Sequence, residues 1–277
     1  MSRVRRRRVF IRVLFALALT GGGTATSAGA ADNVITIRAD SWCPMNCEPG
    51  SDRPGYMIEM AHAIAADAGY RVDYRILPWQ RALRAVRKGR YDCVVGAYRT
   101  DAPDFVFPHN PWGIDRTALF VKAGNPWRYH GLASLAGQRV GIIGGYAYGG
   151  GLEEYARAHP TLFDVFNANK ALETHLRSLM AGRITAVAES VYVMRHTLKI
   201  MRLQSSVKEA GRVGAPTPMY IACSPTSAQS RQLVRIFDEG VIRLRKSGRL
   251  AQILEHYGLR DWQRPPAAGS TSEPAPR

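Results

Sequence analysis

Hydrophobic and polar residues along the chain follow two periods, the two-residue period of strands and the 3.6-residue period of helices. Strand-like runs occupy residues 35–39, 72–76 and 91–97 in the first third of the chain. Residues 57–68 and 78–86 connect them and carry apolar positions at helical spacing. This β-α-β-α-β order predicts a mostly parallel sheet covered by helices.

A second β-α series follows and is flanked by two apolar strands, residues 117–121 and 219–223. We expect these two strands to form a hinge between two lobes, and one continuous sheet across both series would contradict that hinge. The predicted organisation is an α/β protein with lobe 1 at 31–118 and 219–262 and lobe 2 at 119–218. The elements of the second series are strands at 139–143, near 165 and at 184–188, a glycine-rich turn at 144–151, and helices from 152 and through 172–180.

The two ends of the chain differ in composition from this middle part. Six arginines and no acid precede Val13, a short apolar run follows, and Ala28 and Ala30 form an A-x-A-like site. The run is shorter than the roughly 20 residues of a membrane span, so we expect a signal peptide at 1–30 that is cleaved after Ala30. Both the Sec and the twin-arginine route fit. Residues 263–277 are rich in Pro, Ala, Gly and Ser, which predicts a disordered tail.

The positions of the four cysteines indicate the cellular compartment of the protein. None precedes Cys43, so we expect a chain that is free in the periplasm and not lipid-anchored. Cys43 and Cys47 lie four apart in a loop, which predicts a short disulfide in an oxidising compartment. A zinc site is the less favoured alternative, because no further Cys or His pair lies nearby at metal-ligand spacing. Cys93 and Cys223 lie in apolar segments and are interpreted as buried small hydrophobic residues.

The net charge and the sequence motifs exclude several classes of function. The chain has a net charge of +16, and without the six arginines of residues 1–30 it has 32 basic and 22 acidic residues, or +10. These charges are scattered and the chain is expected to be exported, so we expect no nucleic-acid partner. No G-x-S-x-G or H-E-x-x-H motif occurs, and the glycine-rich turn lacks the G-x-G-x-x-G spacing. We therefore expect no catalytic residues, no cofactor and no metal.

Several segments, in this order and spacing, resemble the family-3 extracellular solute-binding proteins. The resemblance spans residues 35–257 and rests on PGYMIEM at 54–60, LPWQRAL at 77–83, KGRYD at 88–92, SLAGQRVG at 134–141 and AGRITAV at 181–187. It implies a two-lobed, type II periplasmic binding protein-like fold. The implied function is capture of a small polar, carboxylate-bearing solute by hinge closure and delivery to the membrane permease of an ABC importer, with the protein a monomer. Some relatives of this fold are cyclohexadienyl dehydratases, and a dehydratase-like enzyme using Glu189 is the alternative.

The chain departs from the family in the loop after the third strand. The family's arginine, which binds the ligand carboxylate, is missing there, and Arg99 lies nearby as a substitute. A surface salt bridge of Arg99 with Asp101 or Asp104 is the other interpretation. Glu189 occupies the place of an aspartate that commonly receives the ligand ammonium.

Further candidates follow strand ends, where parallel sheets carry their binding loops. Trp42 is expected to stack on the ligand or to cover the Cys43 loop, and Tyr98 lies beside Arg99. Trp112 is expected at the cleft rim or in the core. Arg81, in the first turn of its helix, is expected to meet Glu59 or the ligand. Gly145 and Tyr146 lie in the turn whose amides can receive an anion or simply lead into the helix.

Overall fold

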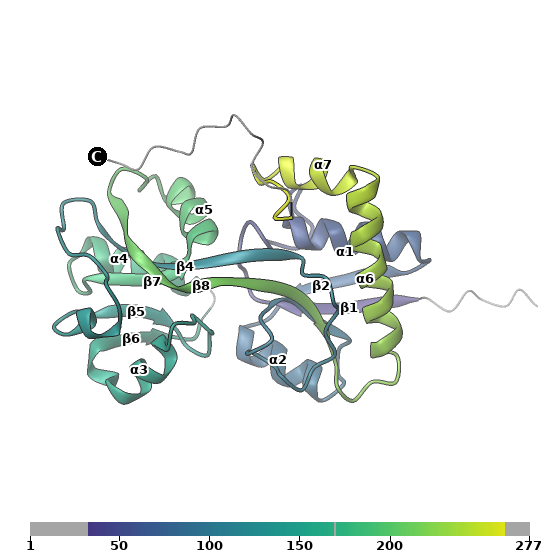
Figure 1. The fold of residues 1–277 in the computed structure, drawn as a ribbon, viewed down its shortest axis with the longest axis horizontal. Coiled ribbons are helices and arrows are strands. Elements are labelled where there is room, and N and C mark those ends of the chain that lie inside the picture. Colours follow the sequence, from purple (N-terminus) through teal and green to yellow (C-terminus); the bar gives the residue numbers. More distant parts are fainter. Residues whose placement is uncertain (1–32, 169, 264–277) are drawn as a thin grey trace, which may run out of the picture. The chain divides into compact units, whose positions relative to one another are not determined.

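The computed structural model describes residues 33–168 and 170–263, and within these ranges eight strands form one mixed sheet of order β2-β1-β3-β8-β4-β7-β5-β6 (Figure 1). The described part of the chain also contains seven α-helices. The predicted signal peptide and its cleavage site lie outside the described residues, as does all but the first residue of the predicted tail.

Lobe 1 is built on three parallel strands. In it, β1 (Val34–Ala39) pairs with β2 (Arg71–Ile76) and β3 (Cys93–Ala97), and β3 pairs antiparallel with the end of β8 (Val207–Cys223). One face is covered by α1 (Tyr56–Asp67), α6 (Ser230–Lys246) and α7 (Arg249–Glu255), and the other by α2 (Trp79–Arg87), as Figure 1 shows.

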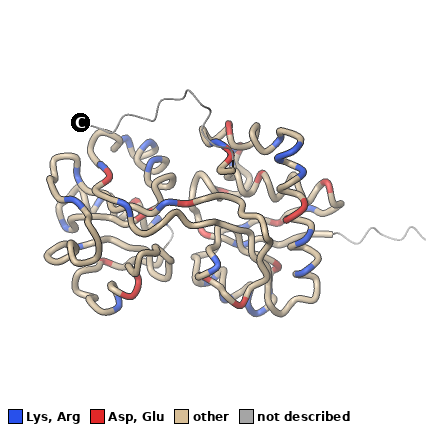
Figure 2. Tube along the Cα trace, viewed as in Figure 1, with Lys and Arg blue, Asp and Glu red and all other residues tan. Residues whose placement is uncertain are grey.

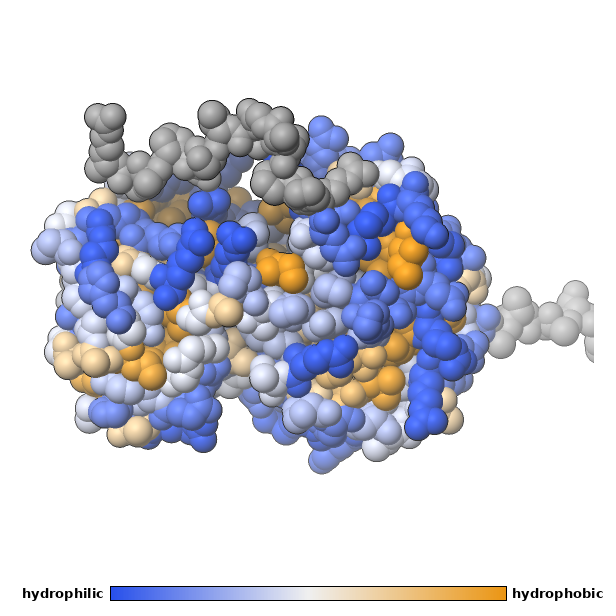
Figure 3. Space-filling view, in the orientation of Figure 1, coloured by the Kyte–Doolittle hydropathy of each residue, from blue (hydrophilic) through white to orange (hydrophobic). Residues whose placement is uncertain are grey.

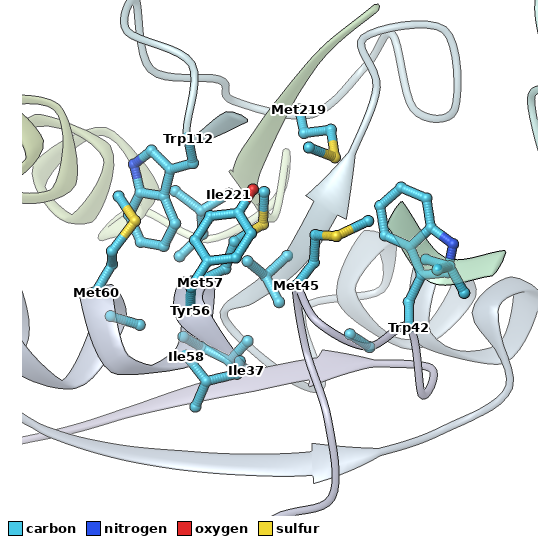
Figure 4. Close-up of a cluster of buried hydrophobic side chains, with 14 of the residues drawn as sticks. Ile37, Trp42, Met45, Tyr56, Met57, Ile58, Met60, Trp112, Met219 and Ile221 are labelled. Carbon is cyan, nitrogen blue, oxygen red and sulfur yellow. The ribbon is translucent and has the colours of Figure 1, made fainter. Parts of the chain in front are cut away.

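The core of lobe 1 lies between α1 and the sheet (Figure 4). Met57, Ile58 and Met60 of α1 are fully buried, as are Ile37 of β1 and Ile221 of β8. Apolar residues surround α1 on most sides because α6 and α7 cover the side that the sheet leaves open. This packing fixes the ends of β1 and β3, from which site residues extend.

Lobe 2 repeats the plan with a different helix set. In it, β5 (Val140–Ile143) pairs in parallel with β6 (Phe163–Phe166) and β7 (Ala186–Ser190), and β7 pairs antiparallel with β4 (Gly113–Lys122). Its helices are α3 (Leu152–Ala158), α4 (Ala171–Met180) and α5 (Val191–Met201), and two short 3-10 helices occupy Leu132–Leu135 and Pro160–Leu162.

Two long strands, β4 and β8, join the lobes, and their pairing differs from the predicted hinge. Their ladder runs from Gly113 paired with Met219 to Lys122 paired with Val207. The segment 117–121 lies in lobe 2, where it pairs with β7, whereas 219–223 belongs to lobe 1, where most of it pairs with β3. The sheet is therefore continuous through β8, and the hinge at 117–121 and 219–223 is wrong. The strands cross between lobes at residues 113–115 and 217–219.

Both cysteine pairs are disulfides. The predicted bond between Cys43 and Cys47 is present, with Cα atoms 4.8 Å apart. Cys93 and Cys223 are buried as expected, but their interpretation as merely small hydrophobic residues is wrong, because their sulfurs are bonded across the β3–β8 ladder. The sequence places them 130 residues apart, and only the antiparallel register brings them opposite each other. All four cysteines are oxidised, which agrees with an exported protein.

Surface charge is dispersed over both lobes. Figure 2 shows lysine and arginine on helices and loops of each lobe, interleaved with acids. On the face in Figure 3, hydrophilic residues predominate and hydrophobic ones form small separate patches. Within 33–168 and 170–263, no helix has the length and apolar character to cross a membrane.

Candidate functional site

A cavity lies between the lobes at the carboxyl ends of the parallel strands. Its volume is about 30 Å³, enough for a water molecule or two. A larger cavity of about 290 Å³ adjoins it and shares five lining residues with it, Asp40, Trp42, Trp79, Tyr146 and Glu189. The remaining residues that line the small cavity are Val95, Gly96, Tyr98, Asp101, Asp115, Thr117, Ala147, Tyr148 and Ser190.

The loop after β1 places Asp40 and Trp42. Trp42 and Asn46 form an isolated β-bridge, with the Trp42 amide donating to the Asn46 carbonyl at 2.7 Å. The buried Asn46 side chain donates to the Asp40 carbonyl at 2.6 Å. The Cys43–Cys47 disulfide closes this turn. These bonds hold the loop, and the rings of Trp42 and Tyr98 meet edge to face with their centres 6.3 Å apart.

The loop after β3 and the crossing strand β4 carry a buried polar network. The Tyr98 hydroxyl donates to Asp115 Oδ2 at 2.6 Å, and the Ser190 hydroxyl donates to Asp115 Oδ1 at 2.5 Å. Asp101 Oδ2 accepts from the Tyr98 amide at 2.7 Å. Between Asp115 and Thr117 the β4–β8 register shifts, because residues 214–216 bulge from β8. Asp115 and Thr117 both line the cavity at this bulge.

Glu189, near the end of β7, carries a carboxylate oxygen with no partner. It is 1% exposed, and its Oε1 accepts from Trp42 Nε1 at 3.1 Å and from the Ser190 amide at 2.7 Å. Its Oε2 is buried and has no hydrogen-bond partner among residues 33–168 and 170–263. A buried polar atom without a partner carries a free-energy cost of about 1–3 kcal/mol, more when charged. This oxygen is therefore available to a donor that enters the cavity.

Three hydrogen bonds run directly between the lobes beside the cavity. Trp42 of lobe 1 donates to Glu189 of lobe 2, and the Tyr146 hydroxyl of lobe 2 donates to the Asp40 carboxylate of lobe 1. The Gln80 side-chain amide donates to the Gly145 carbonyl at 2.8 Å. Each contact joins a residue after a strand of one lobe to a residue of the other. The lobes can separate only if these contacts break.

Burial shifts the ionisation of the acids in this cavity. It raises the pKa of Glu189 to about 8, that of Asp101 to about 7 and that of Asp40 to about 6. Burial also raises the pKa of Asp115, against the two hydroxyl donors that lower it. Loss of water disfavours the charged form of a carboxyl group. The cavity therefore favours either protonated acids or a cation among them.

The lining of the small cavity has one sign of charge. Four carboxyl groups line it, and its described lining residues include no lysine, arginine or histidine. Five aromatic side chains complete it, from Trp42, Trp79, Tyr98, Tyr146 and Tyr148. Lys170 and His196 line the larger cavity only, together with Glu48 and Glu173.

Three predicted binding residues lie away from the cavity. Arg99 is exposed, donates to the Pro108 carbonyl at 2.8 Å and lies 4.7 Å from the centre of the Tyr220 ring. Arg81 is exposed, and its expected partner Glu59 instead accepts from the Tyr257 hydroxyl at 2.5 Å. Trp112 is 0% exposed and packs edge-on against Phe237 in the core of lobe 1. None of the three lines either cavity, so the structure does not bring them together with the other predicted binding residues.

The glycine-rich turn binds a side-chain carboxylate of the same chain. The amides of Tyr148 and Gly149 both donate to the Glu153 carboxylate, in the first turn of α3. These two amides of the turn, which was expected to receive a ligand anion, are therefore engaged by Glu153. The backbone approaches β8 closely here, because a Cβ built on Gly150 would lie 2.9 Å from the Gly214 nitrogen. Tyr146 lines both cavities and Gly145 contacts Gln80.

Four predicted residues do meet at one place, namely Trp42, Tyr98, Tyr146 and Glu189. Sequence reasoning missed the acids Asp40, Asp101 and Asp115. Asp40 directly follows β1 and Asp101 lies four residues after β3, so their position at strand ends was a usable signal. Asp115 lies within β4, and only the crossing of that strand between lobes brings it to the cavity.

Two α/β lobes joined by two crossing strands, with a cavity between them, have the architecture of a two-lobed periplasmic binding protein. The sequence profile of the bacterial extracellular solute-binding proteins, family 3, matches residues 35–260. The chain belongs to this family. A comparison with curated proteins gave no match.

Solved structures share the fold. An ancestral arginine-binding protein bound to arginine is 20% identical, with a TM-score of 0.69 over 81% of this chain and 98% of that one. A histidine kinase sensor domain with similarity to periplasmic binding proteins is 23% identical, with a TM-score of 0.69 over 82% and 98%. The AbpA substrate-binding protein of a Streptococcus pneumoniae amino acid ABC transporter, bound to L-arginine, is 20% identical, with a TM-score of 0.66 over 81% and 94%.

Proposed function

We propose that this protein captures a small polar solute between its lobes in the periplasm and delivers it, as a monomer, to the permease of an ABC importer. The observation that carries the proposal is the cavity lined from both lobes at strand ends, with three polar contacts across it. Opening and closing of the lobes about residues 113–115 and 217–219 would admit the solute and then enclose it. Family membership supports the same role.

The contacts of Arg99 and of the glycine-rich turn do not support the expected binding site for a ligand carboxylate. Arg99 contacts Pro108 and Tyr220 at the surface of lobe 1. Two amides of the glycine-rich turn donate to the Glu153 carboxylate. The solute's polar groups would instead meet the carboxyl groups and aromatic rings of the cavity.

A thermal-shift screen of amino acids, small carboxylates, amines and sugars tests the capture step. A cognate solute should raise the melting temperature and reduce the radius of gyration in solution scattering, because closure compacts the protein. Ala147→Trp should abolish both effects, since Ala147 lines the cavity. The matched control is Ala251→Trp on the exposed side of α7. Solute effects that survive Ala147→Trp would contradict capture in this cavity.

Delivery is tested in the source cell. Loss of the protein should abolish uptake of the radiolabelled cognate solute, and the unchanged chain should restore it while Ala147→Trp should not. Undiminished uptake in its absence would contradict the importer role.

A dehydratase-like activity has one observation in its favour, since Glu189 is a buried acid whose pKa of about 8 suits proton transfer. Such a reaction also needs a cation to hold the substrate carboxylate, and the described residues of the small cavity supply none. Conversion of a carboxylic acid by the purified protein, lost in Glu189→Gln, would establish this second function.

A further inference from the structure

We infer that the solute is a small organic cation that bears N–H donors and no carboxylate, such as an amine or a guanidine. The inference rests on the proposed function and specifies its substrate class. It is carried by the lining of the small cavity and by one unpartnered carboxylate oxygen.

The charge lining the cavity points to a cation. Asp40, Asp101, Asp115 and Glu189 line a space of about 30 Å³ from both lobes, without a described basic residue among them. Buried acids of like charge repel each other, and a cation between them relieves both the repulsion and the loss of water. A ligand carboxylate in the same place would add a fifth acid.

The unpartnered oxygen points to an N–H donor. Glu189 Oε2 is buried and has no hydrogen-bond partner in the described part of the chain, although the other oxygen of the same group accepts two hydrogen bonds. By contrast, both oxygens of Asp115 are already satisfied by hydroxyl groups of Tyr98 and Ser190. The position therefore lacks one donor, and an ammonium or guanidinium N–H supplies it with charge assistance.

The aromatic rings suit the same ligand. Trp42 and Tyr98 meet edge to face, and Tyr146 and Tyr148 lie with ring centres 6.0 Å apart on the opposite lobe. Aromatic faces attract cations through the ring quadrupole, and the attraction is larger where water is excluded. A solute with an apolar chain between cationic groups would extend into the larger cavity, whose lining shares Trp42 and Tyr146.

One feature of the larger cavity could hold a carboxylate and must be tested directly. Lys170 and His196 line it, Lys170 with an exposed side chain. An amino acid could place its ammonium at Glu189 and its carboxylate at these residues. The decisive comparison is therefore between solutes that differ only by a carboxylate.

Calorimetry with two such pairs tests the inference on the full mature protein at pH 7.5. Agmatine should bind at least about tenfold more tightly than L-arginine, and 1,5-diaminopentane at least about tenfold more tightly than L-lysine, since like charges across a desolvated site are disfavoured. Glu189→Gln should weaken amine binding at least tenfold. The control Glu255→Gln, on the exposed surface of α7, should leave it unchanged.

The outcomes separate this inference from the proposed function. If an amino acid binds as tightly as its decarboxylated partner, or a neutral or anionic solute binds while both amines do not, the cation assignment is overturned and capture stands. Failure of every solute class to bind or to cause closure overturns both. If Glu189→Gln does not fold, Asp101→Asn provides the same test from lobe 1, with the same expected loss of amine affinity.

Discussion

Replacing Glu189 by glutamine should stabilise the protein while weakening its binding of solute. Glu189 is 1% exposed, and burial raises its pKa from 4.5 to about 8. The folded state therefore keeps this proton over a range in which the unfolded chain has released it. Stability falls with rising pH wherever the folded state binds more protons, so Glu189 lowers the free energy of unfolding between about pH 4.5 and pH 8.

The magnitude follows from the width of that range. One pKa unit corresponds to 1.36 kcal/mol, so between pH 5 and pH 7.5 the contribution of this group changes by about 3 kcal/mol. Glutamine does not titrate, and its side-chain oxygen can still accept from Trp42 and the Ser190 amide. Asp40 and Asp115 face Glu189 in both proteins, so their own titration largely cancels when the two are compared.

Urea unfolding at pH 5, 6 and 7.5 measures the effect without added solute. The advantage of Glu189→Gln over the parent should grow with pH, reaching about 3 kcal/mol more at pH 7.5 than at pH 5. Glu255→Gln, which removes an exposed carboxyl group from α7, should give a difference that stays near zero. A difference for Glu189→Gln that is constant or falls with pH would refute the reasoning.

Other predictions concern binding, the disulfide and the crossing strands. The affinity for agmatine should rise between pH 6 and pH 8, because binding displaces protons from Asp40, Asp101 and Glu189. The basic residues Lys170 and His196 line only the larger cavity. Calorimetry in two buffers should detect the released protons, and an affinity that does not change with pH would contradict this. Arg99→Ala should leave the affinity within a few-fold of the parent in the same assay, whereas a loss above tenfold would return this residue to the site. Cys93→Ala with Cys223→Ala should lower the free energy of unfolding by about 2–5 kcal/mol in urea, since the bond closes a loop of 130 residues; an unchanged midpoint would show that the bond adds no stability. Gly113→Ala should lower the melting temperature by calorimetric scanning, because its Cβ would lie 2.3 Å from the Tyr56 hydroxyl and overpacking costs about 1–3 kcal/mol; an unchanged melting temperature would contradict that packing.

Much of the fold could be predicted because local patterns agree with the final structure. The strands and helices of each β-α series carry apolar residues on the faces that the sheet buries. The first part of β8 and the helix α5 were not predicted. The first part of β8 contains Gly211, Gly214 and Pro216, which are unusual in strands, and it is held by pairing with β4. The start of α5 was marked by Ser190, whose side chain caps the helix at Val193.

The site was less predictable because it depends on distant pairings. Trp42, Tyr98 and Glu189 were predicted from their positions at strand ends, where open α/β sheets bind ligands, and all three line the small cavity. Arg99 was predicted from its likeness to a ligand-binding arginine, whereas in the structure its guanidinium lies over the ring of Tyr220, more than 100 residues away in the sequence, and it lines neither cavity. The acidic character of the cavity also arises from the sheet, which brings Asp115 of β4 beside Ser190 of β7.

A co-crystal structure with the amine that binds most tightly tests the central claim most directly. The account predicts that the solute lies between the lobes, with a cationic nitrogen within hydrogen-bond distance of Glu189 Oε2 and against the rings of Trp42 and Tyr146. A solute bound outside this cavity, or one held through a carboxylate by Arg99, would contradict it.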